Sequence, residues 1–278
     1  MTFAAKSFLR PIPAVGLLLM SLLLPPPAYA ADEPPVLMNY SIAVVTDYVF
    51  RGVDVFSSVY TTREEEQSAF NVAPAIQPSV TFFSGAGFWF NFWGSFAVTG
   101  RDEDTATGFT GLAGLDELDT TLGYDWSNKL GSFSVGIVDY ALIHPGVQGT
   151  PGSDIQEMFF KWGLPVMESL KPLVSHFVNS DTSATYTALT ISGGEGLTWS
   201  ANAGYGSAAT QGLQDITATI AYDLGGGLGV NANVAYRPTP ALVGYSSDGK
   251  YASAKDGSAA DYPPALVWIG VSWGGEVK

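Results

Sequence analysis

The sequence contains no cysteine, few charged residues and no second long apolar run. Without Cys the protein can form neither a disulfide bond nor a thiolate metal site. Charged residues make up 14% of the 278 residues, compared with about 25% in ordinary globular domains. After residue 24, no apolar stretch approaches the roughly 20 residues that a membrane-spanning helix requires. This composition disfavours both a typical soluble enzyme and a helical membrane protein.

The charge balance is strongly acidic. Lys and Arg total 12 and Asp and Glu total 26, which gives a net charge of -14. Such a surface repels phosphate groups, so we expect no nucleic-acid partner. The glycine runs at 193–196 and 225–227 lack the Lys and the Ser or Thr of a phosphate-binding loop and are interpreted as turns. We therefore predict no cofactor and no bound metal.

The N-terminal segment has the three parts of a secretory signal peptide. Lys6 and Arg10 form a basic start, and a short apolar run ends in three prolines and an Ala-Tyr-Ala cleavage site. We predict that residues 1–30 are the signal peptide and that residues 31–278 are the exported domain. Removing the two bases lowers Lys plus Arg from 12 to 10 against 26 acids, which leaves a net charge of about −16.

In the exported domain, apolar and polar residues alternate along most of the sequence. Hydrophobic residues make up 46% and aromatic residues 13% of the sequence. An alternation of period 2 is typical of strands with two different faces. We predict twelve strands, at residues 39–52, 69–83, 87–99, 115–126, 132–143, 155–164, 169–179, 183–193, 197–207, 213–223, 228–237 and 265–273.

Most connections between these strands alternate between short and long; the one after the seventh strand is an exception and is short. The short ones, rich in Gly, Ser and Asn, are 84–86, 127–131, 165–168, 194–196 and 224–227. The long ones are 53–68, 100–114, 144–154 and 238–264. Bacterial outer-membrane barrels combine short periplasmic turns with long external loops. The sequence therefore predicts an all-β protein, a transmembrane antiparallel up-and-down barrel of about 12 strands with both termini periplasmic. The alternative is a soluble β-sandwich, which would have no reason to alternate its loop lengths.

Two motifs resemble a known family. Residues 46–52, TDYVFRG, are similar to the pattern S-D-Y-x-F-R-G, and residues 74–77, PAIQ, followed by 87–95, GFWFNFWGS, are similar to P-A-x-Q and G-F-Y-x-x-x-W-x-S. These patterns are those of the TorF-type porin family of proteobacterial barrel sequences. The resemblance covers roughly the first half of the exported domain. It implies an outer-membrane barrel with pore activity.

If the apolar faces meet lipid, the polar faces line the lumen. The candidate pore-lining residues are then Asp47, Arg51, Glu117, Asp119, Asp125, Glu157, Lys161, Asp215, Asp223 and Arg237, with Lys171 as a further base. Acids exceed bases in this set, so a conducting lumen should prefer cations. On one continuous strand Asp47 and Arg51 would lie about 13 Å apart. Each should therefore meet a neighbouring strand or an inward loop, and Arg51 is our candidate for a constriction charge.

Three functions fit these features. The leading hypothesis is a porin-like channel for passive diffusion of small solutes in the outer membrane of a Gram-negative bacterium, with no catalysis. The first alternative is a plugged barrel that serves as a scaffold or as a subunit of an envelope complex, and the second is a lipid-modifying enzyme. The enzyme would use His176 with Ser175 or Ser180, but Ser175 is expected on the opposite face of its strand.

Partners and loops leave several points open. We expect the protein to contact outer-membrane lipid and lipopolysaccharide. The acidic runs at 64–66 and 102–104 could bind divalent cations that bridge lipopolysaccharide molecules. Charge runs of this kind are more often simply solvated, which is the interpretation we favour. The sequence does not decide between a monomer, a homo-oligomer and an envelope complex, or whether loop 238–264 folds inward. Asp139 falls on the apolar face of its strand, which requires either a β-bulge or a position at the outer interface.

Overall fold

The computed structural model describes residues 37–51, 53–54, 74–98, 116–143, 155–166, 169–207, 211–238 and 265–278. The predicted signal peptide at 1–30 lies outside the described residues, as do the acidic runs and most or all of each predicted long loop. Among the described residues, no helix is both long and apolar enough to cross a bilayer.

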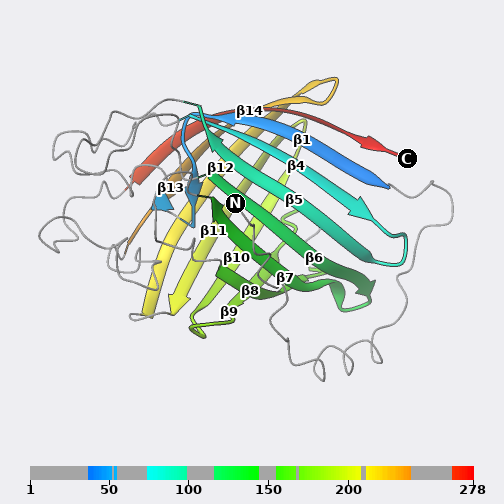
Figure 1. Cartoon of the computed structure of the whole chain (residues 1–278), viewed down its shortest axis with the longest axis vertical. Coiled ribbons are helices and arrows are strands. Elements are labelled where there is room, and N and C mark those ends of the chain that lie inside the picture. The colour runs from blue at the N-terminus through cyan, green and yellow to red at the C-terminus, as the bar shows by residue number, and fades with distance from the viewer. Residues whose placement is uncertain are drawn as a thin grey trace, which may run out of the picture.

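Twelve strands close into one antiparallel barrel (Figure 1). They are β1 (Met38–Val45), β4 (Ala75–Phe83), β5 (Phe88–Ala97), β6 (Asp116–Asn128), β7 (Gly131–Ile143), β8 (Ile155–Gly163), β9 (Leu173–Asn179), β10 (Thr185–Glu195), β11 (Leu197–Ser207), β12 (Gln211–Gly225), β13 (Leu228–Tyr236) and β14 (Ala265–Val277). Each strand pairs with its neighbours in sequence, and β1 closes the barrel by pairing with both β14 and β4. The predicted up-and-down topology is confirmed.

The two rims of the barrel differ. Met38 pairs with Val277, so β1 begins and β14 ends at the same rim. This end, which we call the turn rim, carries the connections at 84–87, 129–130, 164–172, 196 and 226–227. The opposite end, the loop rim, carries the longer connections after β1, β5, β7 and β13. The glycines at 225–227 have φ angles of 86°, 64° and 80°, which explains why this turn is made of glycine.

Ten predicted strands match observed strands to within four residues at each end. The second, predicted at 69–83, corresponds to β4 (Ala75–Phe83), and positions 69–73 of that prediction lie outside the described residues. The first predicted strand is wrong at its end. Strand β1 ends at Val45 instead of continuing to Gly52. Thr46 continues the pairing with β14 for one more residue, donating its N–H to Ile269 O at 2.9 Å and accepting the Ile269 N–H on its hydroxyl at 3.1 Å. The chain then bends into the lumen. The alternation of 47–51 belongs to an inward hairpin, which looks the same in sequence as a longer wall strand.

The outer face of the barrel is apolar. Exposed large hydrophobic side chains far outnumber buried ones among the described residues, and they include Ile42, Leu122, Ile220 and Val271. Near the turn rim, outward aromatic rings from four adjacent strands stack on one another. The ring-centroid distances are 4.7 Å for Phe88–Tyr124, 5.9 Å for Tyr124–Trp126, 5.2 Å for Trp126–Phe133 and 6.1 Å for Phe133–Trp162. An apolar band with an aromatic girdle is the outer surface that a membrane barrel needs.

Asp139 on β7 is a carboxylate on this outer side. The β6–β7 register runs without a break from Asp116↔Ile143 to Asn128↔Gly131, so no bulge in this ladder turns Asp139 inward. Its cross-strand partners are Thr120 and Gln156, which are also polar. Gln156 is the second residue of β8, so this polar group lies towards the loop rim, where a carboxylate costs less than at the centre of a bilayer.

Candidate functional site in the barrel lumen

The lumen is occupied by a short hairpin. Strand β2 (Val49–Phe50) pairs with β3 (Val53–Asp54), and together with the bend at 46–48 they form what we call the plug hairpin, residues 46–54. In Figure 1 its two short blue strands lie within the outline of the barrel. Arg51 stands in its tight turn with a φ of 48°, a region that side-chain-bearing residues rarely adopt. Such a conformation persists only where the surroundings hold it.

Glu157 on β8 holds the Arg51 guanidinium. Arg51 Nη1 donates to Glu157 Oε1 at 2.9 Å and Nη2 to Oε2 at 2.6 Å, so the pair is bidentate. The two side chains are only 7% and 3% exposed. The Tyr140 hydroxyl donates to the same carboxylate at 3.1 Å. A buried, bidentate and hydrogen-bonded pair has the geometry in which charge-charge attraction best offsets desolvation.

Aromatic rings surround the other faces of the guanidinium. The Arg51 Cζ atom lies 4.7 Å from the ring centroid of Phe50, 4.6 Å from that of Phe177 and 4.3 Å from that of Tyr186. Contacts of this length over a ring face are cation–π interactions, which gain strength where water is excluded. The tip of the plug hairpin is therefore bound to β8, β9 and β10 at once.

A β-bulge on β12 adds a fourth attachment. The β11–β12 register shifts between Gly204 and Tyr205, and the extra residue on β12 is Gln214. Because of this shift, Gln214 and Asp215 are both buried, each 1% exposed, although they are consecutive. The Gln214 amide donates to the Arg51 carbonyl at 3.1 Å. Simple alternation assigns Gln214 to the lipid face, so sequence reasoning missed this residue; the only signal in the sequence was a polar side chain out of phase.

Asp215 organises the wall beside the plug hairpin. Its carboxylate accepts hydrogen bonds from the Tyr186 hydroxyl at 2.9 Å, from the Asn202 amide at 3.1 Å and from the Thr217 hydroxyl at 3.3 Å. These donors come from β10, β11 and β12. Asp215 thereby fixes the Tyr186 ring on which Arg51 packs.

The base of the plug hairpin packs against β6. Tyr48 is 6% exposed, hydrogen-bonds to Glu117 and lies 5.4 Å, between ring centroids, from Trp93. Burial raises the pKa of the Tyr48 phenol well above its usual value, and the nearby charges of Glu117 and Asp119 raise it further. Tyr48 therefore remains a neutral hydrogen-bond donor at physiological pH.

An aromatic row lines part of the inner wall between the plug hairpin and the turn rim. Four residues on adjacent strands lie opposite one another across the sheet: Trp89 pairs with Gly123, Gly123 with Gly136, and Gly136 with Phe159. A side chain at Gly136 would collide with the Phe159 ring, and one at Gly123 with the Trp89 ring. The two glycines leave the space over which Trp89 and Phe159 stack, 6.1 Å apart between centroids. The row continues through Phe177 to Tyr186 with centroid distances of 6.0 Å and 6.3 Å.

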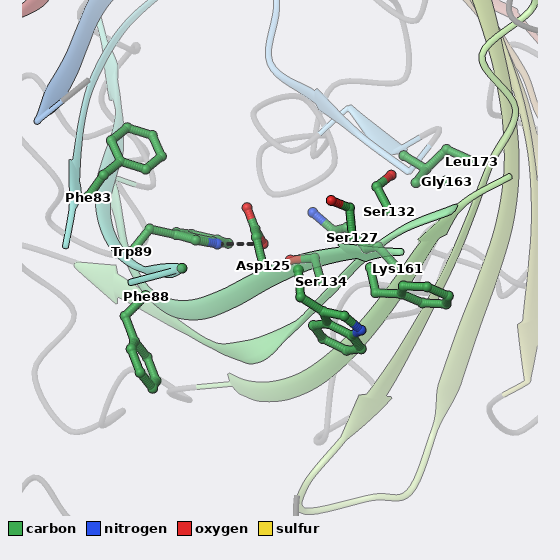
Figure 2. Close-up of a pocket in the computed structure, with 13 residues that line it drawn as sticks. Phe83, Phe88, Trp89, Asp125, Ser127, Ser132, Ser134, Lys161, Gly163 and Leu173 are labelled. Atoms are coloured by element: carbon green, nitrogen blue, oxygen red, sulfur yellow. Dashed lines mark hydrogen bonds between the residues drawn. The ribbon is translucent and has the colours of Figure 1, made fainter. Parts of the chain in front are cut away.

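A cavity of about 550 Å³ opens on the turn-rim side of this row. Lys161 lines it, with its ammonium 4.9 Å from the Phe159 ring centroid. Asp125 lines it too and accepts the Trp89 indole N–H at 2.8 Å, drawn as a dashed line in Figure 2. We call this space the turn-rim cavity. Ligand pockets commonly have volumes of this order.

The predicted pore-lining residues fall into three groups. Asp47, Arg51, Glu117, Asp119, Glu157, Asp215 and Arg237 are largely buried at or near the plug hairpin and the loop-rim ends of the strands. Asp125 and Lys161 line the turn-rim cavity. Asp223 is exposed at the turn rim, where its carboxylate accepts the Gly225 N–H at 2.7 Å, and Lys171 is exposed in the connection between β8 and β9.

The premise about Asp47 and Arg51 requires correction, because they do not share a strand. Asp47 lies in the bend after β1, and Arg51 lies in the turn of the plug hairpin. We expected Arg51 to contact a neighbouring strand or an inward loop. Arg51 itself belongs to an inward hairpin, and its guanidinium pairs with Glu157 on β8. The sequence could not identify Glu157 as its partner, because the two are 106 residues apart.

His176 and Ser175, which were weighed for lipid hydrolysis, point to opposite faces of β9, and Ser180 is exposed in the connection after that strand. His176 Nδ1 lies 2.8 Å from the hydroxyl of Thr187, its cross-strand partner on β10. Ser175 is buried and its neighbour His176 alternates with it to the other face. Among the described residues, no cluster of three or more His, Asp or Glu is arranged to hold a metal ion.

The fold and the lumen together define a closed antiparallel barrel with an apolar exterior and an internal plug hairpin. The chain belongs to the Gcw_chp family, described as bacterial proteins of unknown function, which matches residues 29–206. That match includes the plug hairpin, Glu157 and the aromatic row. No curated protein is similar enough to the chain to give a match.

Proposed function

We propose that this protein is an outer-membrane barrel of a Gram-negative bacterium that forms a narrow, cation-preferring channel for passive diffusion of small solutes. The main support for the proposal is the distribution of side chains. The outer face of the closed barrel is apolar, whereas charged residues are buried in its interior. The resemblance of the TDYVFRG and GFWFNFWGS motifs to TorF-type porins supports the same function. The proposal assigns the protein no catalysis and no cofactor.

Membrane insertion is supported by the stacked aromatic girdle near the turn rim. Tyr and Trp favour the boundary between hydrocarbon and water, since their rings are apolar and their N–H or O–H groups are polar. In the proposed orientation the turn rim, with both chain ends, is periplasmic and the loop rim is external. An epitope tag added after Lys278 should therefore be inaccessible to antibody on intact cells.

Cation preference is supported by the balance of buried charges. The buried acids in the loop-rim half are Asp47, Glu117, Asp119, Glu157 and Asp215, whereas the bases there are Arg51 and Arg237. The bidentate pair between Arg51 and Glu157 cancels one charge of each sign. The remaining acidic side chains outnumber the one remaining base, and their oxygen atoms favour a passing cation over an anion.

The plug hairpin also favours a second candidate, a closed barrel that acts as a scaffold or as a subunit of an envelope complex. Arg51, Glu157, Gln214 and Tyr186 are all nearly buried, so water has little access to the tip of the hairpin. If the hairpin stays in place, the residual path admits only small solutes or none. Conductance separates the two candidates.

The experiment is a planar-bilayer recording of the refolded protein, with the zero-current potential measured across a potassium chloride gradient. We expect small single-channel currents. We also expect the zero-current potential to have the sign that results when potassium permeates more readily than chloride. Glu117→Gln should reduce the cation preference, whereas Glu195→Gln, at the exposed end of β10, is the matched control and should leave it unchanged. Anion preference would refute the proposed selectivity, and a complete lack of current would favour the scaffold.

A further inference from the structure

We propose that the turn-rim cavity is a binding site for a small organic monocarboxylate with an apolar, preferably aromatic, body. The cavity lies at the Trp89 end of the aromatic row, whereas Arg51 of the plug hairpin packs on Tyr186 at the other end. Binding there requires no passage through the barrel, so the inference goes beyond the proposed channel and stands independently of conductance.

The anion-binding group is Lys161. Its side chain contacts the Phe159 ring at 4.9 Å and the Phe177 ring at 5.9 Å, measured from Nζ to the centroids. Within the part of the chain that the structure describes, Lys161 lies within salt-bridge distance of no carboxylate. A half-buried ammonium that faces a cavity without a carboxylate partner is suited to pair with an acid from solution.

Asp125 lines the same cavity but forms no salt bridge with Lys161. Asp125 pairs across the sheet with Ser134, and Ser134 pairs with Lys161, so the two charges stand two strands apart. Two strand spacings amount to about 10 Å between backbones. The Trp89 indole also holds the Asp125 carboxylate by a 2.8 Å hydrogen bond. Asp125 therefore remains close enough to repel a dianion without occupying the place of a monoanion.

The remaining lining suits an apolar body. In Figure 2 Phe83 and Trp89 lie at one end of the cavity wall, Asp125 between, and Lys161 and Leu173 towards the other end. Ser127, Ser132 and Ser134 add hydroxyl groups that can bond to carboxylate oxygens. One cation, several hydroxyls and aromatic surface within about 550 Å³ match a ligand such as benzoate in size and chemistry.

The test measures binding of benzoate to the refolded full chain in detergent by isothermal titration calorimetry. We expect saturable binding that weakens about tenfold or more in Lys161→Gln, which loses a charge-assisted hydrogen bond. Lys171→Gln is the matched control, because it removes the same charge from an exposed connection at the same rim. Asp125→Asn should tighten binding, since it removes the repelling carboxylate. Heat-modifiable gel migration verifies that each variant is folded.

Two further ligands make the result decisive. Benzyl alcohol, which lacks the charge, and phenyl phosphate, which carries more of it, should both bind more weakly than benzoate. No binding of benzoate to the wild type, equal binding to Lys161→Gln, or equal binding of benzyl alcohol would overturn the inference. Tighter binding of phenyl phosphate would overturn the choice of a monocarboxylate. A barrel that conducts without binding benzoate refutes only this site, and one that binds without conducting refutes only the channel.

Discussion

Arg51 forms an ion pair, three cation–π contacts and a backbone hydrogen bond, and its backbone has a left-handed conformation. Its guanidinium pairs with Glu157, three rings cover its faces, and its carbonyl accepts from Gln214. These contacts join a turn to four strands that the sequence places between 106 and 163 residues away. At the scale of single residues, Arg51 is what keeps the plug hairpin inside the barrel.

Removing the Arg51 charge alone should cost more than removing the whole pair. Arg51→Met leaves the Glu157 carboxylate buried and unpaired, so we expect the free energy of unfolding to fall by about 3 kcal/mol. Adding Glu157→Gln to that variant should recover part of the loss, because no unpaired charge remains. Urea unfolding in lipid vesicles measures both variants. If the double variant is no more stable than Arg51→Met, the ion pair does not hold the hairpin as described.

At the scale of elements, the sequence shows which residues of a strand share a face. It does not show where the chain leaves the barrel wall. Strand β11 was predicted with its observed bounds, because Trp199 and Tyr205 alternate strictly with polar or small residues. Residues 47–51 alternate just as well, yet they form the plug hairpin. Only their distant contacts with β8, β10 and β12 distinguish the two outcomes, and a local pattern contains no information about contacts so far along the chain.

The bulge at Gln214 illustrates the same limit for the candidate site. Alternation placed Asp215 and Glu157 on the inward faces of β12 and β8, where they are buried. Arg51 is inward for a different reason, because it lies in the turn of the plug hairpin and not on a wall strand. Alternation did not place Gln214 inward, because one inserted residue reverses the phase on one side of the bulge. It also did not foresee the aromatic row, in which the glycines at positions 123 and 136 make room for the Trp89 and Phe159 rings.

The absence of native cysteine makes the predicted faces of β12 directly measurable. Single cysteines at positions 216 to 221, labelled with a fluorophore in vesicles, should alternate in quenching by brominated lipid. We expect strong quenching at Ile216, Ala218 and Ile220, which are exposed on the outer face, and weak quenching at Thr217 and Thr219. Uniform quenching along the strand, or none, would contradict a membrane-spanning β12.

At the scale of the whole molecule, the barrel combines two compartments of different chemistry. The loop-rim half contains the plug hairpin and an excess of buried carboxylates, and the turn-rim half contains the turn-rim cavity with Lys161. The aromatic row connects them, from Trp89 in the cavity lining to Tyr186, on which Arg51 packs. This division gives each half a separate role in the account: the plug hairpin limits the path, and the cavity recognises a ligand.

The central claim is that the plug hairpin constricts a membrane-spanning barrel, and single-channel conductance tests it most directly. Residues 47–54 are replaced by a Gly-Ser segment of equal length, and heat-modifiable migration is used to check that the barrel still closes. The account predicts a conductance several-fold higher than that of the wild type, because the side chains that fill the lumen are gone. A closed barrel whose conductance is unchanged by the replacement would contradict it.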